Sequence, residues 1–546
     1  MIEDNSGSKQ GQRVSKTRRA VLGGLGASGI AAVAATGVVE GKGPGNEGRG
    51  GNGNGNGART LDEGIALEWV DQALETARRG LIIPTSGRVY AFLGTVVYDA
   101  VNGIHRERGE GFEAGEQYAV EPDVIPGACR VAALAGGANE ILGRLADEEL
   151  DDETAEELQD DYDSLLEAQL DEYQDGNQDA GEEWGRQVAA TMLEDVRGDA
   201  EPNCESAFDV VEGKSDLEAG MTQRADEWGS ACLADLDPWG LDAPDSVVAP
   251  EPPELDSLEF AVEYNRTKVA GDLNRAEDEV QATEIEFDID EGRYDKTEAQ
   301  ALANGTYVGG SVEDEELGYS DDLEYDAEAN TLTLDIDPPE GFRDEGAFWA
   351  ALPGTPQPEG RWLQVAKVNV ENEGLSFYET VRLYARLGIA VQDAGIANWN
   401  NKRRYAGRMG WRPHAATGTT EQIPDSAANA EDRPDVSDLG NPDLRTQADW
   451  NAISGWSPAP EYASGLTTVS TTSQRLLEEE FGAVGEFEVT VDTETEGEIT
   501  EEYDSLQDAR DQAARSRVWS GRHYAAAQLG AIEMADRIVE EVEDTI

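Results

Sequence analysis

Residues 517–523 read Arg-Val-Trp-Ser-Gly-Arg-His, so that Arg517 stands six residues before His523. An arginine fork matches two oxygens of a tetrahedral oxyanion, and a neutral imidazole can act as a nucleophile or as a metal ligand. Each residue alone also fits a structural role, Arg517 in a surface ion pair and His523 as a hydrogen-bonded core residue. Two further stretches earlier in the chain make a chemical role more specific.

The first of these stretches comprises residues 399–402, Trp-Asn-Asn-Lys, and residues 411–414, Trp-Arg-Pro-His. Lys402 is one of five lysines after residue 58, and the one that stands among Trp and Arg. Alone, Lys402 would also fit a solvated helix end and Arg412 a surface ion pair. Together with Arg517 these fixed cations predict a site for a phosphate-like oxyanion.

The second of these stretches, residues 458–466, reads Pro-Ala-Pro-Glu-Tyr-Ala-Ser-Gly-Leu. A Ser464-Gly465 turn at the start of a helix offers a hydroxyl and backbone N–H groups, which bind further oxygens of such an anion. The three stretches therefore supply cations, neutral donors and one candidate axial nucleophile for a single oxyanion.

The sequence resembles the vanadium-dependent haloperoxidases, within the type 2 phosphatidic acid phosphatase superfamily. Residues 88–102, Arg-Val-Tyr-Ala-Phe-Leu-Gly-Thr-Val-Val-Tyr-Asp-Ala-Val-Asn, resemble an early helix of that family. Phe348-Trp349, the segment 385–399 and the three stretches above follow in the family's order. The resemblance covers most of residues 60–546 and implies an all-α fold of helical bundles.

The resemblance also implies roles for individual residues. Lys402, Arg412 and Arg517 would grip equatorial oxygens of vanadate, or of phosphate in the same place. Ser464 would bind an oxygen through its hydroxyl and Gly465 through its N–H. His523 would be the axial vanadium ligand, or the phosphorylated nucleophile of a phosphatase.

Two departures from the family pattern affect these roles. The position after Ser-Gly, where the family carries an acid–base histidine, is Leu466, and losing such a group costs about 10²–10⁴ in rate. Lys402 and Arg412 stand ten residues apart, about three more than in the family. His414 could substitute as the proton donor, and it also fits an ordinary loop position.

Three functions remain open from the sequence. The first is an exported haloperoxidase-like enzyme that oxidises halide with hydrogen peroxide at a vanadate bound by His523. The second is a phosphomonoesterase that uses His523 as nucleophile. The third is a relative that binds an oxyanion or a partner without turnover, which Leu466 favours.

The composition limits the partners. Among 546 residues there are 114 Asp and Glu against 42 Lys and Arg, a formal net charge of −72. Nucleic acid and anionic lipid would be repelled, so the expected partners are small molecules, with a homo-oligomer possible. Such an acidic chain suits concentrated salt, where screening removes the self-repulsion.

The chain divides into three expected parts. Residues 1–39 carry Arg18-Arg19 before a short apolar run and resemble a twin-arginine export signal. A membrane anchor is the alternative for this run, although it is marginal in length. Residues 40–58 form a Gly/Asn-rich linker, and residues 59–546 the helical domain. We expect an extracellular or cell-surface protein with no stable membrane anchor after cleavage of the signal.

Local patterns place the elements of that domain. Alternation at Ile285–Ile289 and Leu332–Ile336 predicts strands in a small β-rich insertion at about 284–343. A capping box opens a helix at Ser376 that should run to about Asn398. Three cysteines are present, and Cys204–Cys232 is the expected disulfide, with Cys129 free.

Overall fold

The computed structural model describes residues 61–81, 83–108, 117–121, 127–173, 176–197, 231–275, 280, 283–289, 293–314, 316–351, 354–406, 408, 409, 412–417, 436, 441–447, 449–453, 459–493 and 497–546. The predicted export signal (residues 1–39), the predicted linker (residues 40–58) and Cys204 lie outside these residues, as does the side chain of Cys232. The predicted disulfide therefore stays a prediction, and Cys129 is buried at the start of the helix Arg130–Glu149.

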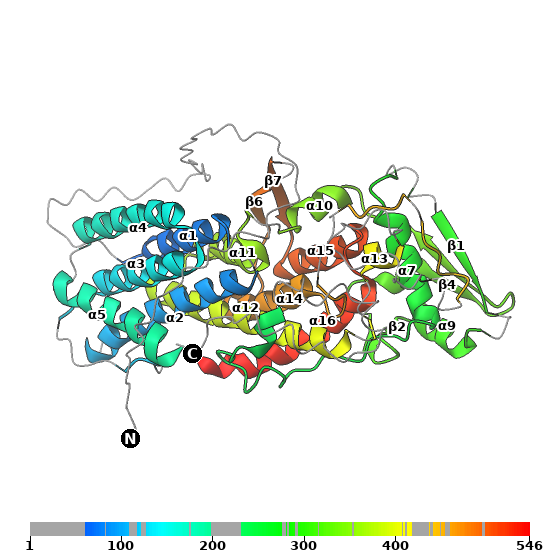
Figure 1. The fold of residues 1–546 in the computed structure, drawn as a ribbon, viewed down its shortest axis with the longest axis horizontal. Coiled ribbons are helices and arrows are strands. Elements are labelled where there is room, and N and C mark those ends of the chain that lie inside the picture. Colours follow the sequence, from blue (N-terminus) through cyan, green and yellow to red (C-terminus); the bar gives the residue numbers. More distant parts are fainter. Residues whose placement is uncertain are drawn as a thin grey trace, which may run out of the picture. The chain divides into compact units, whose positions relative to one another are not determined.

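The N-terminal helices form one bundle (Figure 1). Its members are α1 (Gly64–Arg78), α2 (Ile83–Arg108), α3 (Arg130–Glu149), α4 (Asp152–Glu172) and α5 (Gln178–Thr191), with a short π-helical turn, Met192–Val196, at the end. Helix α3 packs against α2, α4 and α5. Asp151 caps the acidic helix α4 by accepting from the N–H groups of Glu153 and Thr154, which satisfies two of the otherwise unpaired donors of its first turn.

A second group of helices holds the three predicted stretches. Its members are α11 (Gln357–Glu373), α12 (Phe377–Tyr405), α13 (Pro413–Thr417), α14 (Gly465–Phe481), α15 (Leu506–Trp519) and α16 (Ala525–Val542). Helix α12 packs against α2 of the first bundle as well as against α14 and α16, so it joins the two groups. The approach of α2 and α12 depends on Gly94, because a Cβ there would lie 2.5 Å from the carbonyl oxygen of Tyr384.

The capping box at Ser376 and Glu379 is present, which confirms the predicted start of α12. The predicted end near Asn398 was wrong, because the helix continues to Tyr405. The seven added residues place Lys402 on the last turns of the helix, and its buried side chain helps to fix the site described below.

Two buried aspartates tie loops to the central helices. Asp99 of α2 accepts from the backbone N–H groups of residues 118–120 at 2.6–2.9 Å. Asp393 of α12 accepts from those of residues 239–241 over the same distances. Asp99 belongs to the stretch that resembled a family helix, and its role here is to fold the chain.

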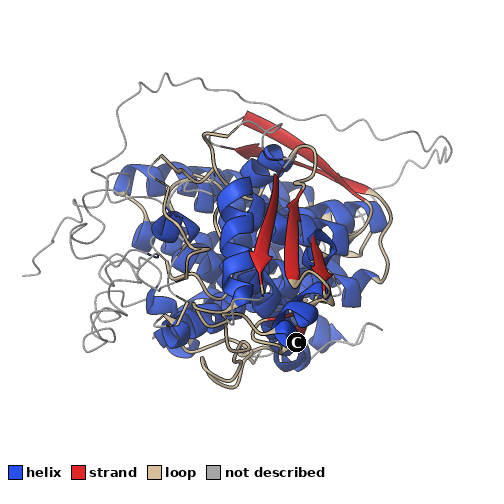
Figure 2. Cartoon of the chain, turned by 90° about the vertical axis from the view of Figure 1, so that its right-hand side faces the viewer, coloured by secondary structure: helices blue, strands red, loops and turns tan. Residues whose placement is uncertain are grey.

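The strands form small sheets beside the helices (Figure 2). They are β1 (Thr283–Asp288), β2 (Thr306–Tyr307), β3 (Val312–Glu313), β4 (Leu323–Asp326), β5 (Thr331–Ile336), β6 (Phe487–Thr493) and β7 (Gly497–Tyr503). The order β1-β5-β4 is antiparallel, and Ile285 pairs with Leu334 as the alternation suggested. This sheet packs against α7 (Leu258–Ala270) and α9 (Lys296–Ala303), so the expected insertion contains a helix as well.

The remaining short elements are the 3₁₀ turns Ala231–Asp235, Tyr319–Asp322 and Glu543–Thr545 and the helix α10 (Phe342–Phe348). Within the described residues the architecture is all-α with a small sheet insertion, as the sequence predicts. None of the described helices combines the length and the apolar character needed to cross a bilayer.

Candidate active site

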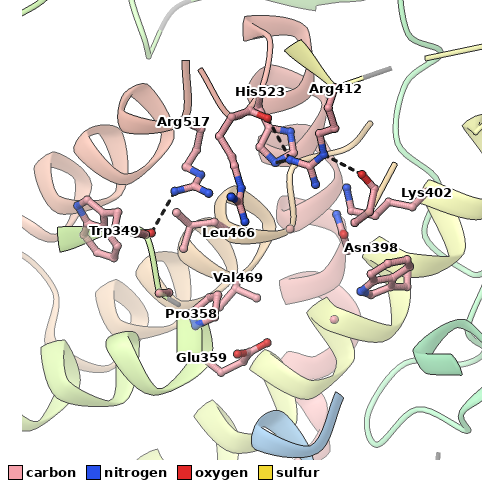
Figure 3. A pocket seen from close by; sticks show the side chains of 17 residues that line it. Trp349, Pro358, Glu359, Asn398, Lys402, Arg412, Leu466, Val469, Arg517 and His523 are labelled. Atoms are coloured by element: carbon pink, nitrogen blue, oxygen red, sulfur yellow. Dashed lines mark hydrogen bonds between the residues drawn. The ribbon is translucent and has the colours of Figure 1, made fainter. Parts of the chain in front are cut away.

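The three stretches predicted from the sequence, which lie far apart along the chain, meet at one cavity of about 110 Å³ (Figure 3). Lys402 comes from the end of α12, Arg412 from the residue before α13, and Arg517 and His523 from the connection of α15 to α16. Gly465, at the first position of α14, also lines the cavity. The structure thus brings together five of the residues that the sequence predicted.

Lys402 is almost fully buried, and its ammonium binds backbone. Nζ donates to the carbonyl oxygens of Pro460 at 2.8 Å and Glu461 at 3.2 Å, and to that of Ala463. These contacts use all three protons of the ammonium. Lys402 therefore fixes the 460–463 segment in the described state, and gripping an anion would require it to exchange one carbonyl.

The guanidinium of Arg412 lies against Nε2 of His523. Its Nε donates to the carbonyl of Ala459 at 2.8 Å and its Nη1 to that of Arg522 at 3.1 Å. The same Nη1 lies 2.6 Å from His523 Nε2. The two carbonyls thus anchor Arg412 with its guanidinium directed at the imidazole.

Arg517 faces the same cavity from the end of α15. Nη1 donates to the carbonyl of Trp349 at 3.1 Å, while Nε has no hydrogen-bond partner among the described residues. A buried guanidinium with an unused donor is costly unless a ligand completes it. The orphaned N–H is the feature expected of a cation that waits for an anion.

Ser464 is the N-cap of α14, and its hydroxyl oxygen accepts from the N–H of Thr467 at 3.4 Å. Ser464 N donates to the carbonyl of Ala527, which ties the turn to α16. Gly465 lines the cavity at the N-terminus of α14, and the unpaired N–H groups and positive dipole end of a helix N-terminus favour anions. Leu466, the next residue, lines the cavity with an apolar side chain.

The fold and this part of the chain match known proteins. Residues 382–546 match the family model of the VCPO second helical-bundle domain. A solved bacterial vanadium-dependent iodoperoxidase is 19% identical, with a TM-score of 0.57 over 89% of this chain and 97% of that one. The chain has the haloperoxidase fold, and its residues 382–546 belong to the VCPO second-domain family.

Two further haloperoxidase structures match more distantly. They are the holo and apo forms of a bacterial vanadium-dependent chloroperoxidase, each 13% identical to this chain. Their TM-scores are 0.43 and 0.40, over 89% and 85% of this chain and over 97% and 95% of theirs. No curated protein sequence gives a significant match.

The cations that line the cavity are strongly desolvated. Burial lowers the pKa of Arg412 to about 10 and that of Arg517 to about 9, the latter with help from Arg412. Burial also lowers the pKa of Lys402 and Arg522, with neighbouring cations adding to it. Arg412 and Arg517 stay charged at neutral pH, so the cavity wall carries positive charge inside a strongly acidic protein.

His523 stays neutral beside these cations. Burial lowers its pKa well below the ordinary value of 6.5, and Arg412 is the largest of the neighbouring charges that add to this effect. A neutral imidazole keeps a lone pair on one ring nitrogen, which is the form that binds metals and attacks phosphorus.

Three charged residues of the site were missed in the sequence. Arg522 lines the cavity although only its neighbour His523 was singled out. Glu461 lies behind His523, with Oε1 3.1 Å from Nδ1, and it belongs to the quoted 458–466 stretch. Glu359, on the first turn of α11, lines the cavity, and burial raises its pKa to about 7. Arg522 and Glu461 stand within the quoted stretches 517–523 and 458–466, so the sequence could have pointed to both. No pattern in the sequence pointed to Glu359.

His414, the predicted substitute proton donor, lies in α13, but its side chain is outside the described part of the structure. Its role therefore stays a prediction. Among the described residues, no cluster of three or more His, Cys, Asp or Glu side chains could hold a metal cation. The donor set of the cavity fits an oxyanion instead.

Proposed function

We propose that this chain is an exported vanadium-dependent haloperoxidase that oxidises halide with hydrogen peroxide. The observation that carries the proposal is that Arg412, 2.6 Å from a neutral His523, lines one cavity with His523 and Arg517. Buried cations repel one another, and an oxyanion among them relieves that repulsion and fills the unused Arg517 donor.

The residues present fit vanadate. Arg412 and Arg517 would hold its equatorial oxygens, Ser464 and the N–H of Gly465 a further oxygen, and the Nε2 lone pair of His523 the vanadium. Bound vanadate supplies a Lewis-acid centre that activates hydrogen peroxide. Lys402 would contribute its charge, either from its present position or after exchanging a backbone carbonyl for an anion oxygen.

Leu466 limits the proton transfers that this site can perform. It offers no proton at the point where the family pattern has a histidine, so proton transfer there falls to water or to the substrate itself. Leucine also keeps that wall apolar, together with Val469 and Trp399. We therefore expect slow turnover and preference for the halide that is oxidised most easily, iodide.

A phosphomonoesterase is the second candidate, because the unprotonated Nε2 of His523 could attack phosphorus in the same cage. Leu466 leaves no leaving-group acid at its position, so this activity would be confined to aryl phosphates, whose leaving groups need little protonation. Inorganic phosphate would then compete with vanadate for the cavity.

Export by the twin-arginine route, to the cell surface or medium, is part of the same proposal and rests on Arg18-Arg19 and the apolar run after them. Small-molecule substrates fit the cavity, whose volume of about 110 Å³ suits a single small anion with peroxide or halide.

The test is halogenation of a phenolic dye by the mature chain in high salt with vanadate, peroxide and iodide or bromide. We expect vanadate-dependent halogenation by wild type and none by His523→Ala. A wild type that binds vanadate but halogenates nothing would overturn the peroxidase proposal. Hydrolysis of 4-nitrophenyl phosphate that depends on His523 would then favour the phosphatase.

A further inference from the structure

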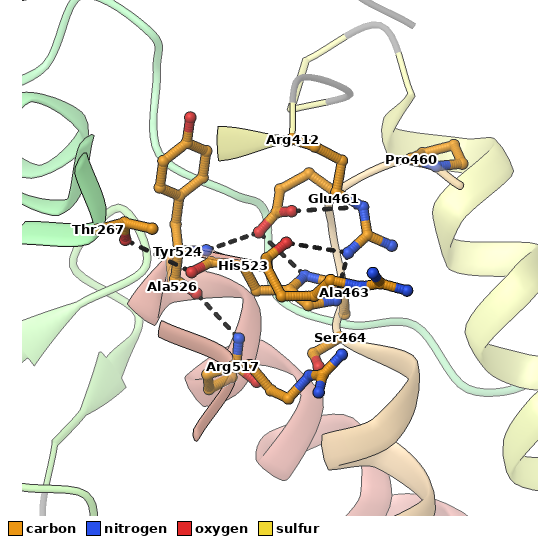
Figure 4. Close-up of polar contacts among 12 residues, drawn as sticks. Thr267, Arg412, Pro460, Glu461, Ala463, Ser464, Arg517, His523, Tyr524 and Ala526 are labelled. Carbon is orange, nitrogen blue, oxygen red and sulfur yellow. Dashed lines mark hydrogen bonds and ion pairs between the residues drawn. The ribbon is translucent and has the colours of Figure 1, made fainter. Parts of the chain in front are cut away.

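The two ring nitrogens of His523 face opposite partners (Figure 4). Nε2 lies 2.6 Å from Arg412 Nη1, and Nδ1 lies 3.1 Å from Glu461 Oε1. A guanidinium can only donate, so Nε2 is the acceptor and carries no proton. In a neutral imidazole the proton is therefore on Nδ1, the nitrogen that faces the carboxylate.

Glu461 is held in place from several sides. It is completely buried, and Oε1 accepts from the N–H of Tyr524 at 2.8 Å. Oε2 lies 3.7 Å from Arg412 Nε and has no hydrogen-bond partner among the described residues. Lys402 also fixes the backbone of Glu461 through the carbonyl oxygen. The carboxylate therefore cannot move away from the imidazole without losing these contacts.

Glu461 does not line the cavity, and the imidazole lies between it and the anion cage. The contact from Nδ1 departs from the alignment of a full hydrogen bond, which is common in ligand-free sites.

We propose that Glu461 is the positioning residue of His523: it holds the proton on Nδ1, turns the Nε2 lone pair toward the cage, and stabilises the positive charge that the imidazole gains on bonding to an oxyanion centre. This inference rests on the proposed function for its anion. Carboxylates that accept from the far nitrogen of a histidine ligand fix the tautomer and raise the ligand's basicity.

The charge of Glu461 depends on its surroundings. Burial raises the pKa of its carboxyl to about 7, while Arg412, Lys402 and Arg517 oppose this shift. His523 and, from helix α7, Glu263 also face it. Experiments at pH 8 therefore examine the ionised carboxylate.

The first arm of the test uses the anion-free chain, so it does not depend on vanadate binding. In ¹⁵N and ¹H spectra of histidine-labelled protein at pH 8, we expect the His523 proton on Nδ1, the nitrogen 3.1 Å from Glu461 Oε1. His523→Ala assigns the signal. Glu461→Gln keeps an acceptor but loses the charge, and should move the proton resonance upfield. A proton on Nε2 in wild type, or an unchanged shift in the variant, would overturn the proposal.

The second arm is vanadate titration calorimetry at pH 8. Loss of a carboxylate behind a ligating histidine costs roughly 10–100-fold in affinity, and we expect that loss in Glu461→Gln. Glu263→Gln is the control for replacing a buried carboxyl by an amide, because Glu263 is also fully buried and accepts from the N–H of Ala526 at 2.9 Å without contacting His523. It should stay within about two-fold of wild type.

An affinity of Glu461→Gln within two-fold of wild type would contradict the positioning role. Should this variant not fold by circular dichroism, Glu461→Asp keeps the charge at a shorter reach, and it should bind between wild type and His523→Ala. A wild type that binds no vanadate would count against the proposed function, and the spectra of the anion-free chain would then decide the role of Glu461 alone.

Discussion

Arg412 Nη1 lies 2.6 Å from His523 Nε2, so the lone pair that faces the cavity is already engaged before any anion arrives. An anion that bonds to Nε2 must take this place, and Arg412 must turn its N–H groups to the anion's oxygens. The guanidinium stays anchored meanwhile, because Nε donates to the carbonyl of Ala459 and Nη1 also donates to that of Arg522. The site can therefore be preorganised without being blocked.

Arg412→Ala should weaken vanadate binding by roughly 10–100-fold, since a charge-assisted hydrogen bond contributes about 1.5–3 kcal/mol. Arg412→Lys should recover part of this affinity, because it restores the charge but not the fork. Calorimetry in high salt measures both. Arg404→Ala is the control, because Arg404 is an exposed arginine at the end of α12. Unchanged or tighter binding by Arg412→Ala would show that Arg412 only obstructs His523.

Leu466→His should raise turnover. The new imidazole would stand on the cavity wall next to Gly465 and could transfer protons, an effect typically worth about 10²–10⁴ in rate. Leu466→Gln, which is polar but cannot transfer protons in this way, is the matched control and should stay near wild type. The measurement is kcat for vanadate-dependent iodide oxidation. Equal rates for both variants would mean that proton transfer at this position does not limit the reaction.

Glu359→Gln should stabilise the protein at pH 8 but not at pH 5. Burial raises the pKa of this carboxyl from 4.5 to about 7, and its side-chain partner is the Ser86 hydroxyl at 3.5 Å. The folded state therefore binds more protons than the unfolded state between these values, so stability falls as pH rises through this window. The cost at pH 8 is roughly 3 kcal/mol, which the neutral variant avoids.

Thermal unfolding in high salt at both pH values tests this, with Glu488→Gln on the exposed face of β6 as control. A Glu359→Gln chain with a lower Tm than wild type at pH 8 would show that the carboxylate is favourably solvated or paired.

Folding should depend on salt. A net charge of −72 repels itself over about 30 Å at 0.01 M ionic strength but over only about 3 Å at 1 M. We expect the far-ultraviolet circular dichroism of the mature chain to lose helix signal on dilution from molar salt and to regain it on return. A full helix signal in dilute buffer would refute this expectation.

Local signals made much of the fold predictable. The capping box at Ser376 and Glu379 depends on residues three apart, and Ile285 and Leu334 follow strict alternation within their own strands. The Arg517-to-His523 spacing lies within one helix end and its turn. Such features depend on short-range geometry, which the sequence displays directly.

The unpredicted features depend on contacts across the fold. The three carbonyls that bind Lys402 belong to a segment about sixty residues later, and no pattern around Lys402 announces them. Glu359 enters the cavity because α11 packs against α14. Glu461 stood within a quoted stretch, but its partner His523 lies 62 residues away, so its role appeared only with the fold.

The central claim is that His523 and the cations around it form an oxyanion cage. Calorimetric titration of the mature chain with orthovanadate in high salt, beside His523→Ala, tests it most directly. The account predicts saturable one-site binding by wild type and its loss in a variant that keeps the wild-type circular dichroism. No binding by wild type, or equal binding by His523→Ala, would contradict it.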